Sequence, residues 1–510
     1  MRYRRDVGLR PRKTKTASGA TGVQIVEHVG GRRVIVEHLG SGHTDEEVAA
    51  LLAMAEEKIH AGQERLDLDL SPESKVRSSG DAIVRGHSSE VLWEALAGAY
   101  SDLGFDVVAD KTFQALVCAR LIEPTSKLDT IRVLEDIGVK APHRNTINAC
   151  LARCVERDYR TRIATACWEH VTAAAGPGAA LILYDLTTLH FEAEKEDDLR
   201  KVGMSKERRV DPQITVGLLV ARDGFPLDLQ VFEGNKAETK TLIPVITAFQ
   251  ERHQVTDMVV VADAGMLSAS NLNDLEDAGL SFIVASRTSK APKELEDHFG
   301  RRGNAIADGA IIELTRPMGQ GKYRRDRRVV WQYKWQRAQR DRRTLNAQID
   351  RAQRVADRTE PLKKQRFVKV AGKSVTLDDA SIDRARESAG YKGYVTNIDP
   401  TAMDGHAVVA AYHDLWQVEQ SFRMAKSDLK ARPIFHRTRD SIEAHLTIVF
   451  AALAIARHLQ NRTGTSVKKA VQTLRRIHTV IVDIGGHNIT ARTPLDADAQ
   501  AIIDALRAQH

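Results

Sequence analysis

The feature that most constrains the fold is the order of apolar runs between residues 180 and 286. Short continuous apolar runs predict buried strands, whereas longer amphipathic stretches predict helices. The pattern predicts strands over 180–184, 214–221 and 225–233, a helix over 237–253, a strand over 258–262, a helix over 271–278 and a strand over 281–286. This order predicts an α/β fold whose partly parallel sheet is covered by helices.

Two of the predicted strands end directly in an aspartate, Asp185 after Tyr184 and Asp263 after Ala262. Ligands of open α/β sheets bind outside the carboxyl ends of strands, so both carboxylates would face one crevice if the two strands are neighbours. A hard cation such as Mg²⁺ is typically held by one or two carboxylates together with substrate phosphates. The alternative for each aspartate alone is a turn former or a helix cap.

A predicted amphipathic helix over 405–427 offers a third acid. At about 100° per residue, one face carries Tyr412, Trp416, Glu419, Arg423 and Lys426. A separate apolar stripe, suited to docking on the sheet, contains Leu415, Val418, Phe422 and Ala425. A glutamate close to lysine and arginine stays ionised, as a metal ligand must. The alternative is that Glu419, Arg423 and Lys426 form salt bridges on an exposed helix face.

The positive charge is concentrated in one segment. The chain has a net charge of +7 and a pI near 9.1, yet residues 321–370 hold 17 Lys/Arg against 5 Asp/Glu, so the remainder is slightly acidic. A second basic patch occupies residues 1–16, with 7 Lys/Arg against one Asp. Local basic blocks of this kind indicate a surface that binds the phosphates of nucleic acid. The alternative is a solvated helix face.

The N-terminal third predicts a hairpin followed by helices. Residues 22–39 form the hairpin, with Gly30-Gly31 at its turn, and Thr44 caps the helix that follows. Residues 66–80 are polar and predict a linker. From 90 to 174 the pattern is helical, with breaks at Pro124 and Pro142.

Within that helical stretch, residues 128–157 predict two helices joined by a turn. The second helix presents polar and basic residues suited either to a DNA groove or to packing in a bundle: Arg144, Asn145, Thr146, Asn148 and Arg153.

The segment 290–404 interrupts the order of the sheet. It predicts a helix over 336–356 and strands over 310–315, 329–333, 367–370 and 394–397. A second helix, over 446–459, is apolar enough to lie in the core.

Several protein classes are disfavoured. The apolar run from Leu446 to Ala456 is too short to span a bilayer, and no apolar stretch of a signal peptide follows the basic N-terminus. No membrane partner is therefore expected. The four cysteines lack metal-site spacing and predict reduced thiols in a cytoplasmic protein.

The chain resembles bacterial insertion-sequence transposases of the DDE type, in the group marked by a Tyr-x2-Arg-x3-Glu-x6-Lys signature. Tyr412, Glu419 and Lys426 match the signature, whereas Leu415 stands at the arginine position. Further blocks resemble the group in the same order along the chain: 221–227, 232–238, 262–266 and 432–437. The resemblance covers about residues 85–460.

The resemblance implies an RNase H-like catalytic core in which Asp185, Asp263 and Glu419 bind Mg²⁺, with Mn²⁺ as an alternative. It implies cleavage of element ends and joining of the 3′-hydroxyl to target DNA, in a homodimeric synaptic complex at the bacterial nucleoid. A strand-containing insertion before the last acid would grip the end DNA. The expected DNA contacts are Tyr412, Arg423, Lys426, Arg324, Arg325, Arg327, Arg328, Lys334 and Arg337.

The expected division of the chain follows from these assignments. It comprises a basic arm, hairpin and helix (1–80), a helical DNA-binding region (81–175), the first part of the core (176–289), the basic insertion (290–404), the second part of the core (405–470) and a tail (471–510). A boundary is expected at Gly176-Pro177-Gly178. Two further functions stay open, a catalytically inactive DNA-binding relic and an RNase H-like nuclease without strand transfer.

Overall fold

The computed structural model describes most of the chain. The described residues are 9–15, 20–29, 32–59, 83–175, 180–192, 195–203, 211–236, 241–255, 258–264, 268–286, 295–296, 298, 306–361, 366–371, 374–484 and 487–508. The predicted turn at Gly30-Gly31, the linker at 66–80 and the break at 176–178 lie outside them. The chain divides into two compact units, Met1–Ser79 and Gly80–His510, each with its own hydrophobic core.

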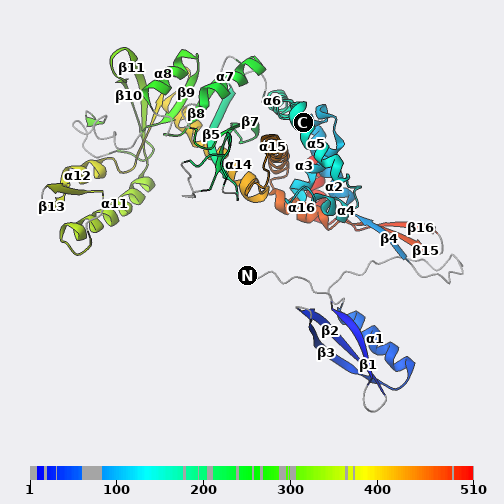
Figure 1. The fold of residues 1–510 in the computed structure, drawn as a ribbon. Helices are drawn as coiled ribbons and strands as arrows, with labels where there is room; N and C mark the ends of the chain where they lie inside the picture. Colours follow the sequence, from blue (N-terminus) through cyan, green and yellow to red (C-terminus); the bar gives the residue numbers. More distant parts are fainter. Residues whose placement is uncertain are drawn as a thin grey trace. The chain divides into compact units, whose positions relative to one another are not determined.

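The first unit is a three-stranded antiparallel sheet with one helix packed on it (Figure 1). Its elements are β1 (Arg10–Lys15), β2 (Thr21–Val29), β3 (Arg32–Gly42) and α1 (Asp45–Ile59). The predicted hairpin is confirmed as β2 and β3, whereas β1 was not predicted. The predicted cap is also confirmed, because Thr44 Oγ1 accepts a hydrogen bond from the Glu47 amide at 3.2 Å while the Glu47 carboxylate accepts from the Thr44 amide.

The second unit is built on an eight-stranded mixed sheet in the order β10-β11-β14-β9-β8-β5-β6-β7. Its strands are β5 (Ala180–His190), β6 (Gln213–Ala221), β7 (Pro226–Glu233), β8 (Met258–Ala262), β9 (Ser281–Ala285), β10 (Ile311–Met318), β11 (Arg325–Tyr333) and β14 (Tyr391–Thr396). The helices α7 (Leu242–His253) and α8 (Ala269–Asp277) precede β8 and β9 along the chain. The order predicted between residues 180 and 286 is confirmed. One detail is corrected, since β5 runs on to His190 and Asp185 therefore lies inside the strand.

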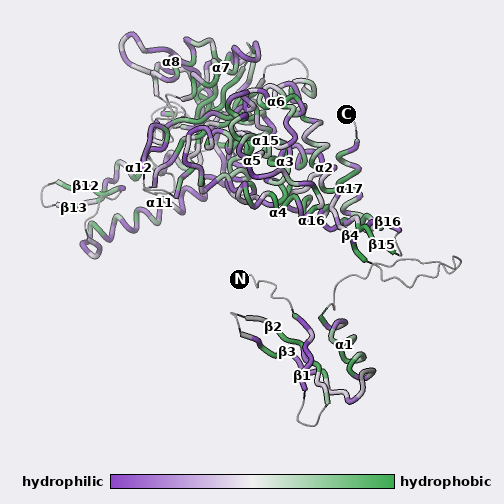
Figure 2. The backbone as a smooth tube through the Cα atoms, turned by 45° about the vertical axis from the view of Figure 1, so that its right-hand side comes forward, coloured by the Kyte–Doolittle hydropathy of each residue, from purple (hydrophilic) through white to green (hydrophobic). Residues whose placement is uncertain are grey.

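The segment 290–404 does not stand apart from this sheet. It supplies the strands β10, β11 and β14, and β14 pairs directly with β9. Only its middle forms a satellite core of its own, with α11 (Trp335–Ala356), β12 (Val368–Ala371), β13 (Ser374–Leu377) and α12 (Asp379–Glu387). The helix α11 is hydrophilic along most of its length (Figure 2). The expected insertion is thus partly an extension of the core sheet.

A helical body packs against the β7 side of the sheet. It contains α2 (Glu90–Asp102), α3 (Lys111–Ile122), α4 (Thr130–Asp136), α5 (Arg144–Glu156), α6 (Tyr159–Ala175), α15 (Arg439–Thr463), α16 (Val467–Arg475) and α17 (Ala497–Arg507). The core helix predicted over 446–459 is confirmed, because α15 lies between the sheet and the helices α3 and α5 (Figure 1). By length and hydropathy α15 could cross a membrane, but 94% of its apolar window is buried inside the fold.

The expected C-terminal tail is folded. A second three-stranded sheet joins the start of the unit to its end through β4 (Ile83–Ser88), β15 (Thr479–Ile484) and β16 (His487–Arg492), and α17 packs on α15 and α16. All four cysteines are free and buried in the helical body, as predicted.

The predicted helix over 405–427 is interrupted. The structure has α13 (Gly405–His413), a tight turn at Asp414 and Leu415, α14 (Trp416–Arg423) and a π-helical turn over Met424–Asp428. Hydrogen bonds from residue i+3 to residue i replace the α-helical pattern at the first break. Lys426 lies in the π-turn, a distortion frequent at functional sites.

Candidate active site

Strand pairing brings the first two aspartates to one level of the sheet. β5 and β8 are parallel neighbours, with Leu183 opposite Val261. Asp185 lies two residues beyond Leu183 within β5, and Asp263 lies two residues beyond Val261, directly after the end of β8. Asp185 is half-buried and Asp263 is exposed. The expectation that the two strands are neighbours is met.

The third acid reaches the same place from the helices. Tyr412, near the end of α13, is buried, and this burial raises the pKa of its hydroxyl. The negative charges of Asp263, Glu419 and Asp185 raise the same pKa further. Coulomb interaction weakens with distance, so the charges of all three acids reach the surroundings of this hydroxyl.

The helix α14 presents Glu419 to solvent while its other side is buried. The predicted apolar stripe is confirmed, because its four members are all buried: Leu415, Val418, Phe422 and Ala425. Within the described part of the chain neither Glu419 nor Arg423 makes an ion pair. The salt-bridged helix face considered above is therefore not formed by these two residues, and Glu419 is available as a ligand.

A buried arginine fixes the position of α14. The guanidinium of Arg457, on α15, donates to the Gly224 carbonyl at 3.1 Å, to Ser421 Oγ at 3.0 Å and to the Gln417 side chain at 3.0 Å. It therefore ties α14 to the turn between β6 and β7. Sequence reasoning missed Arg457, and the signal available was a charged residue inside a strongly apolar helix, which is rarely buried without partners.

Three cations act on the helix that carries Tyr412. Lys392, on β14, has its ammonium 4.5 Å from the ring centroid of Tyr412. The positive charges of Lys392, Arg337 and Lys334 all lower the pKa of His413, which burial lowers first. Arg337 and Lys334 were predicted to contact DNA, whereas Lys392 was not, because a lysine within a short strand carries no distinctive sequence signal.

The donor set of the site suits a hard divalent cation. Three carboxylates offer only oxygen ligands, which Mg²⁺ prefers, and Mg²⁺ usually completes its shell with water and substrate phosphates. Among the described residues, no group of three or more Asp, Glu, His or Cys side chains lies close enough together to hold a metal ion. The chemistry of the residues fits the metal, with further ligands coming from outside the chain.

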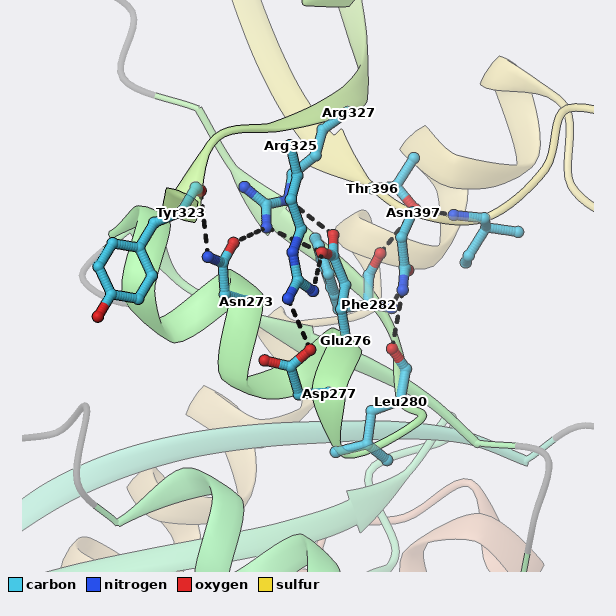
Figure 3. A network of polar contacts seen from close by, with 11 residues as sticks. Asn273, Glu276, Asp277, Leu280, Phe282, Tyr323, Arg325, Arg327, Thr396 and Asn397 are labelled. Atoms are coloured by element: carbon cyan, nitrogen blue, oxygen red, sulfur yellow. Dashed lines mark hydrogen bonds and ion pairs between the residues drawn. The ribbon is translucent and has the colours of Figure 1, made fainter. Parts of the chain in front are cut away.

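Two of the predicted DNA-binding arginines instead hold the sheet to α8 (Figure 3). Arg327 is fully buried, with its guanidinium bonded to Glu276 at 2.7 Å and to Asn273. Arg325 is ion-paired with Glu276 at 2.9 Å and with Asp277 at 2.6 Å. The Arg327 side chain thus has no exposed surface for the predicted phosphate contact in this structure, and two carboxylates already neutralise Arg325.

Arg328 is likewise structural. Its buried guanidinium pairs with Glu313 at 2.7 Å and donates to the Met403 carbonyl at 2.7 Å, which links β10 and β11 to the segment before α13. Its charge is therefore already matched by a carboxylate in this structure, and DNA binding by Arg328 stays a prediction. Arg324 is exposed, and Lys334 and Arg337 are half-buried at the start of α11. The basic block thus divides into buried structural arginines and accessible ones.

The predicted helix pair over 128–157 is confirmed as α4 and α5. Four of the five polar residues of α5 are exposed: Arg144, Asn145, Thr146 and Asn148. Arg153 is instead paired with Asp110 at 2.6 Å. The helix packs on α15 and α3, as a bundle member would. Groove reading by its exposed residues stays a prediction.

A family profile described as Transposase DDE domain matches residues 177–455, which is more than half of the chain. The chain belongs to the DDE transposase family. Membership implies an enzyme that cleaves nucleic acid, and enzymes of this family typically use divalent metal ions. The matched range includes all three acids of the candidate site.

One solved structure similar to this DDE transposase is a piggyBac transposase synaptic complex with hairpin DNA, determined by cryo-EM. It shares 10% sequence identity, with a TM-score of 0.35, over 76% of this chain and 70% of the other. No curated protein matches the sequence.

Proposed function

We propose that this protein is the transposase of a bacterial insertion sequence, which cleaves the ends of its element and joins each freed 3′-hydroxyl to target DNA. The observation that carries the proposal is the parallel pairing of β5, which holds Asp185, with β8, which Asp263 follows, in a chain of the DDE family, and the charges of both aspartates and of Glu419 act on Tyr412. An RNase H-like core is part of the proposal, and the parallel pair of β5 and β8 supports it.

In this proposal the three carboxylates would hold two Mg²⁺ ions, or Mn²⁺ in their place. Such ions stabilise the attacking and leaving oxygens of an in-line displacement. The residues of the chain itself position the DNA. Arg423 and Lys426 on the α14 side, and Arg324, Lys334 and Arg337 on the β11–α11 side, would neutralise phosphates around the cut. Tyr412 would lie against the sugar-phosphate backbone.

The proposal includes assembly and place of action. Cutting and joining two element ends requires both ends to be held together, which a homodimer does through one symmetric interface. The enzyme would act on element ends and target DNA at the bacterial nucleoid. Dimer formation on end DNA is measurable by light scattering.

The test uses duplexes that carry the DNA flanking the coding region, where terminal inverted repeats are expected. Asp185→Asn, Asp263→Asn and Glu419→Gln should each lower strand cleavage with Mg²⁺ by about a hundredfold or more, because each removes a charge that holds the reacting centre. Binding of the same duplex in EDTA should persist. Asp274→Asn is the matched control, since Asp274 is exposed on α8 without an ion pair among the described residues.

Each outcome decides between the functions considered. Cleavage retained by one of the three variants removes that residue from the triad. A wild-type protein that binds end DNA without cutting it would be the inactive relic. A wild-type protein that cuts without forming joined products would be a nuclease.

A further inference from the structure

Lys392 is a cation at the centre of the site with no carboxylate bound to it. It lies on β14, half-buried, and no ion pair or hydrogen bond of its ammonium occurs within the described part of the chain. A buried charge is normally paired, since leaving water is costly for it. The unpaired ammonium therefore needs an explanation.

Two aromatic rings hold the ammonium in place. Its nitrogen lies 4.5 Å from the ring centroid of Tyr412 and 5.8 Å from that of Tyr394. The two rings are themselves in contact, with centroids 4.8 Å apart. The faces of aromatic rings attract a cation without neutralising it. The side chain is thus positioned while its charge stays available to an anion.

The neighbours of Lys392 include both signs of charge. Arg337 lies beside it. The guanidinium of Arg337 is 3.5 Å from the carbonyl oxygen of Gln332, the residue on β11 that pairs with Lys392, and 3.5 Å from the carbonyl oxygen of Gly390, two residues before Lys392. The negative charges of Asp263 and Glu419 also act on the ammonium. An anion entering this region meets Lys392 and Arg337 next to the acids.

We infer that Lys392 and Arg337 form a binding site for one DNA phosphodiester group in the neighbourhood of Asp263 and Glu419. The inference rests on the proposed function, because it takes DNA as the substrate. Three carboxylates repel a phosphate, and two cations at their edge offset this repulsion. Lysine acts as a point charge and arginine as a two-pronged donor, so together they hold the non-bridging oxygens in one orientation. Lys392 is thus a substrate-binding residue of the site.

Salt dependence of binding measures this contact directly. Each phosphate neutralised by a duplex-binding protein contributes about 0.9 to the slope of log affinity against log salt concentration. The probe is a duplex with one terminal inverted repeat, titrated in EDTA against the full-length protein at several salt concentrations. We expect Lys392→Gln to reduce the magnitude of the slope by up to about 0.9, since Arg337 still faces the same phosphate, and Lys392→Arg to retain it.

Two further variants make the test specific. Lys468→Gln removes the same charge from an exposed position on α16, and its slope should equal that of the wild type. Arg337→Gln, at the start of α11, should reduce the slope as Lys392→Gln does. If Lys392→Gln lowers the melting temperature, the lysine is needed for folding. The slope measured for Arg337→Gln then decides whether the phosphate site exists.

The outcomes separate this inference from the proposed function. Unchanged slopes in both Lys392→Gln and Arg337→Gln would overturn the phosphate site, whatever the cleavage activity. A purely structural role for Lys392, in holding the two tyrosines, predicts a lower melting temperature and an unchanged slope. If the two variants reduce the slope but the wild-type protein cleaves no DNA, the phosphate site stands and the proposed enzymatic function is overturned.

Discussion

At the scale of single residues, the position of Glu419 depends on a contact between a glycine and an arginine. Gly224 has a positive φ of 84°, and its carbonyl accepts a hydrogen bond from the buried Arg457. A Cβ at this position would lie 1.8 Å from Nη2 of Arg457. The close approach of backbone and guanidinium requires the absence of a side chain. The turn between β6 and β7 therefore sets the place of α14.

This contact predicts a difference between two glycine substitutions. Gly224→Ala and Gly279→Ala both place alanine at positive φ, which costs about 1–2 kcal/mol of folding free energy. Gly279 has open space around its Cβ position. Gly224→Ala should cost about 2 kcal/mol more than Gly279→Ala, because it also displaces hydrogen bonds of a buried charge. Urea unfolding of both variants measures the difference, and equal costs would show that Arg457 relaxes freely.

At the scale of elements, α7 is held to α6 by an aromatic group that contains a titratable ring. His253 lies 4.5 Å from the ring centroid of Phe249 and 5.5 Å from that of Trp168. Burial, with the neighbouring charge of Arg252, lowers the pKa of His253 to about 4. The docking of this helix therefore favours the neutral imidazole.

The lowered pKa of His253 predicts that the stability of the protein depends on pH. Between pH 6.5 and about 4 the unfolded chain binds a proton at His253 that the folded chain does not, so the free energy of unfolding should fall as pH is lowered through this window. His253→Phe keeps the stacking and should make the fall shallower. Chemical denaturation at several pH values measures both proteins. Above pH 7 their profiles should run parallel, and identical slopes below pH 6.5 would contradict the assignment.

At the scale of the whole molecule, the chain has two separate cores. The core of the first unit consists of residues between Val23 and Ile59, whereas that of the second begins at Val91. Because the two clusters share no residue, the folding free energy of each unit comes from its own buried surface. The large unit carries all three acids and Lys392.

This division predicts the effect of truncation. A chain of residues 80–510 should keep the main thermal transition of the full-length protein within a few degrees, because it retains every residue of its hydrophobic core. Differential scanning calorimetry of both chains provides the measurement. A transition lower by more than about 10 °C, comparable to losing about 9 kcal/mol in a chain of this size, would show that the units stabilise each other.

The sequence by itself determined the local structure and the identity of the acids. Alternating and continuous apolar patterns report which side chains face a core, so the strands around Asp185 and Asp263, the core helix α15 and the cap at Thr44 could be predicted. The amphipathic pattern over residues 405–427 offered Glu419, and the resemblance to the signature motif supported it. Each of these signals comes from residues close together in the chain.

Only the tertiary structure decided which charges are free. Arg327 and Arg328 look like DNA-binding residues in a basic block, but β11 joins the core sheet and brings Glu276 and Glu313 against them. Lys392 carries no sequence signal, and only the pairing of β14 with β9 places it beside the acids. The physical reason is that an ion pair or a shared site depends on distance in space, which long-range strand pairing sets and local sequence patterns do not report.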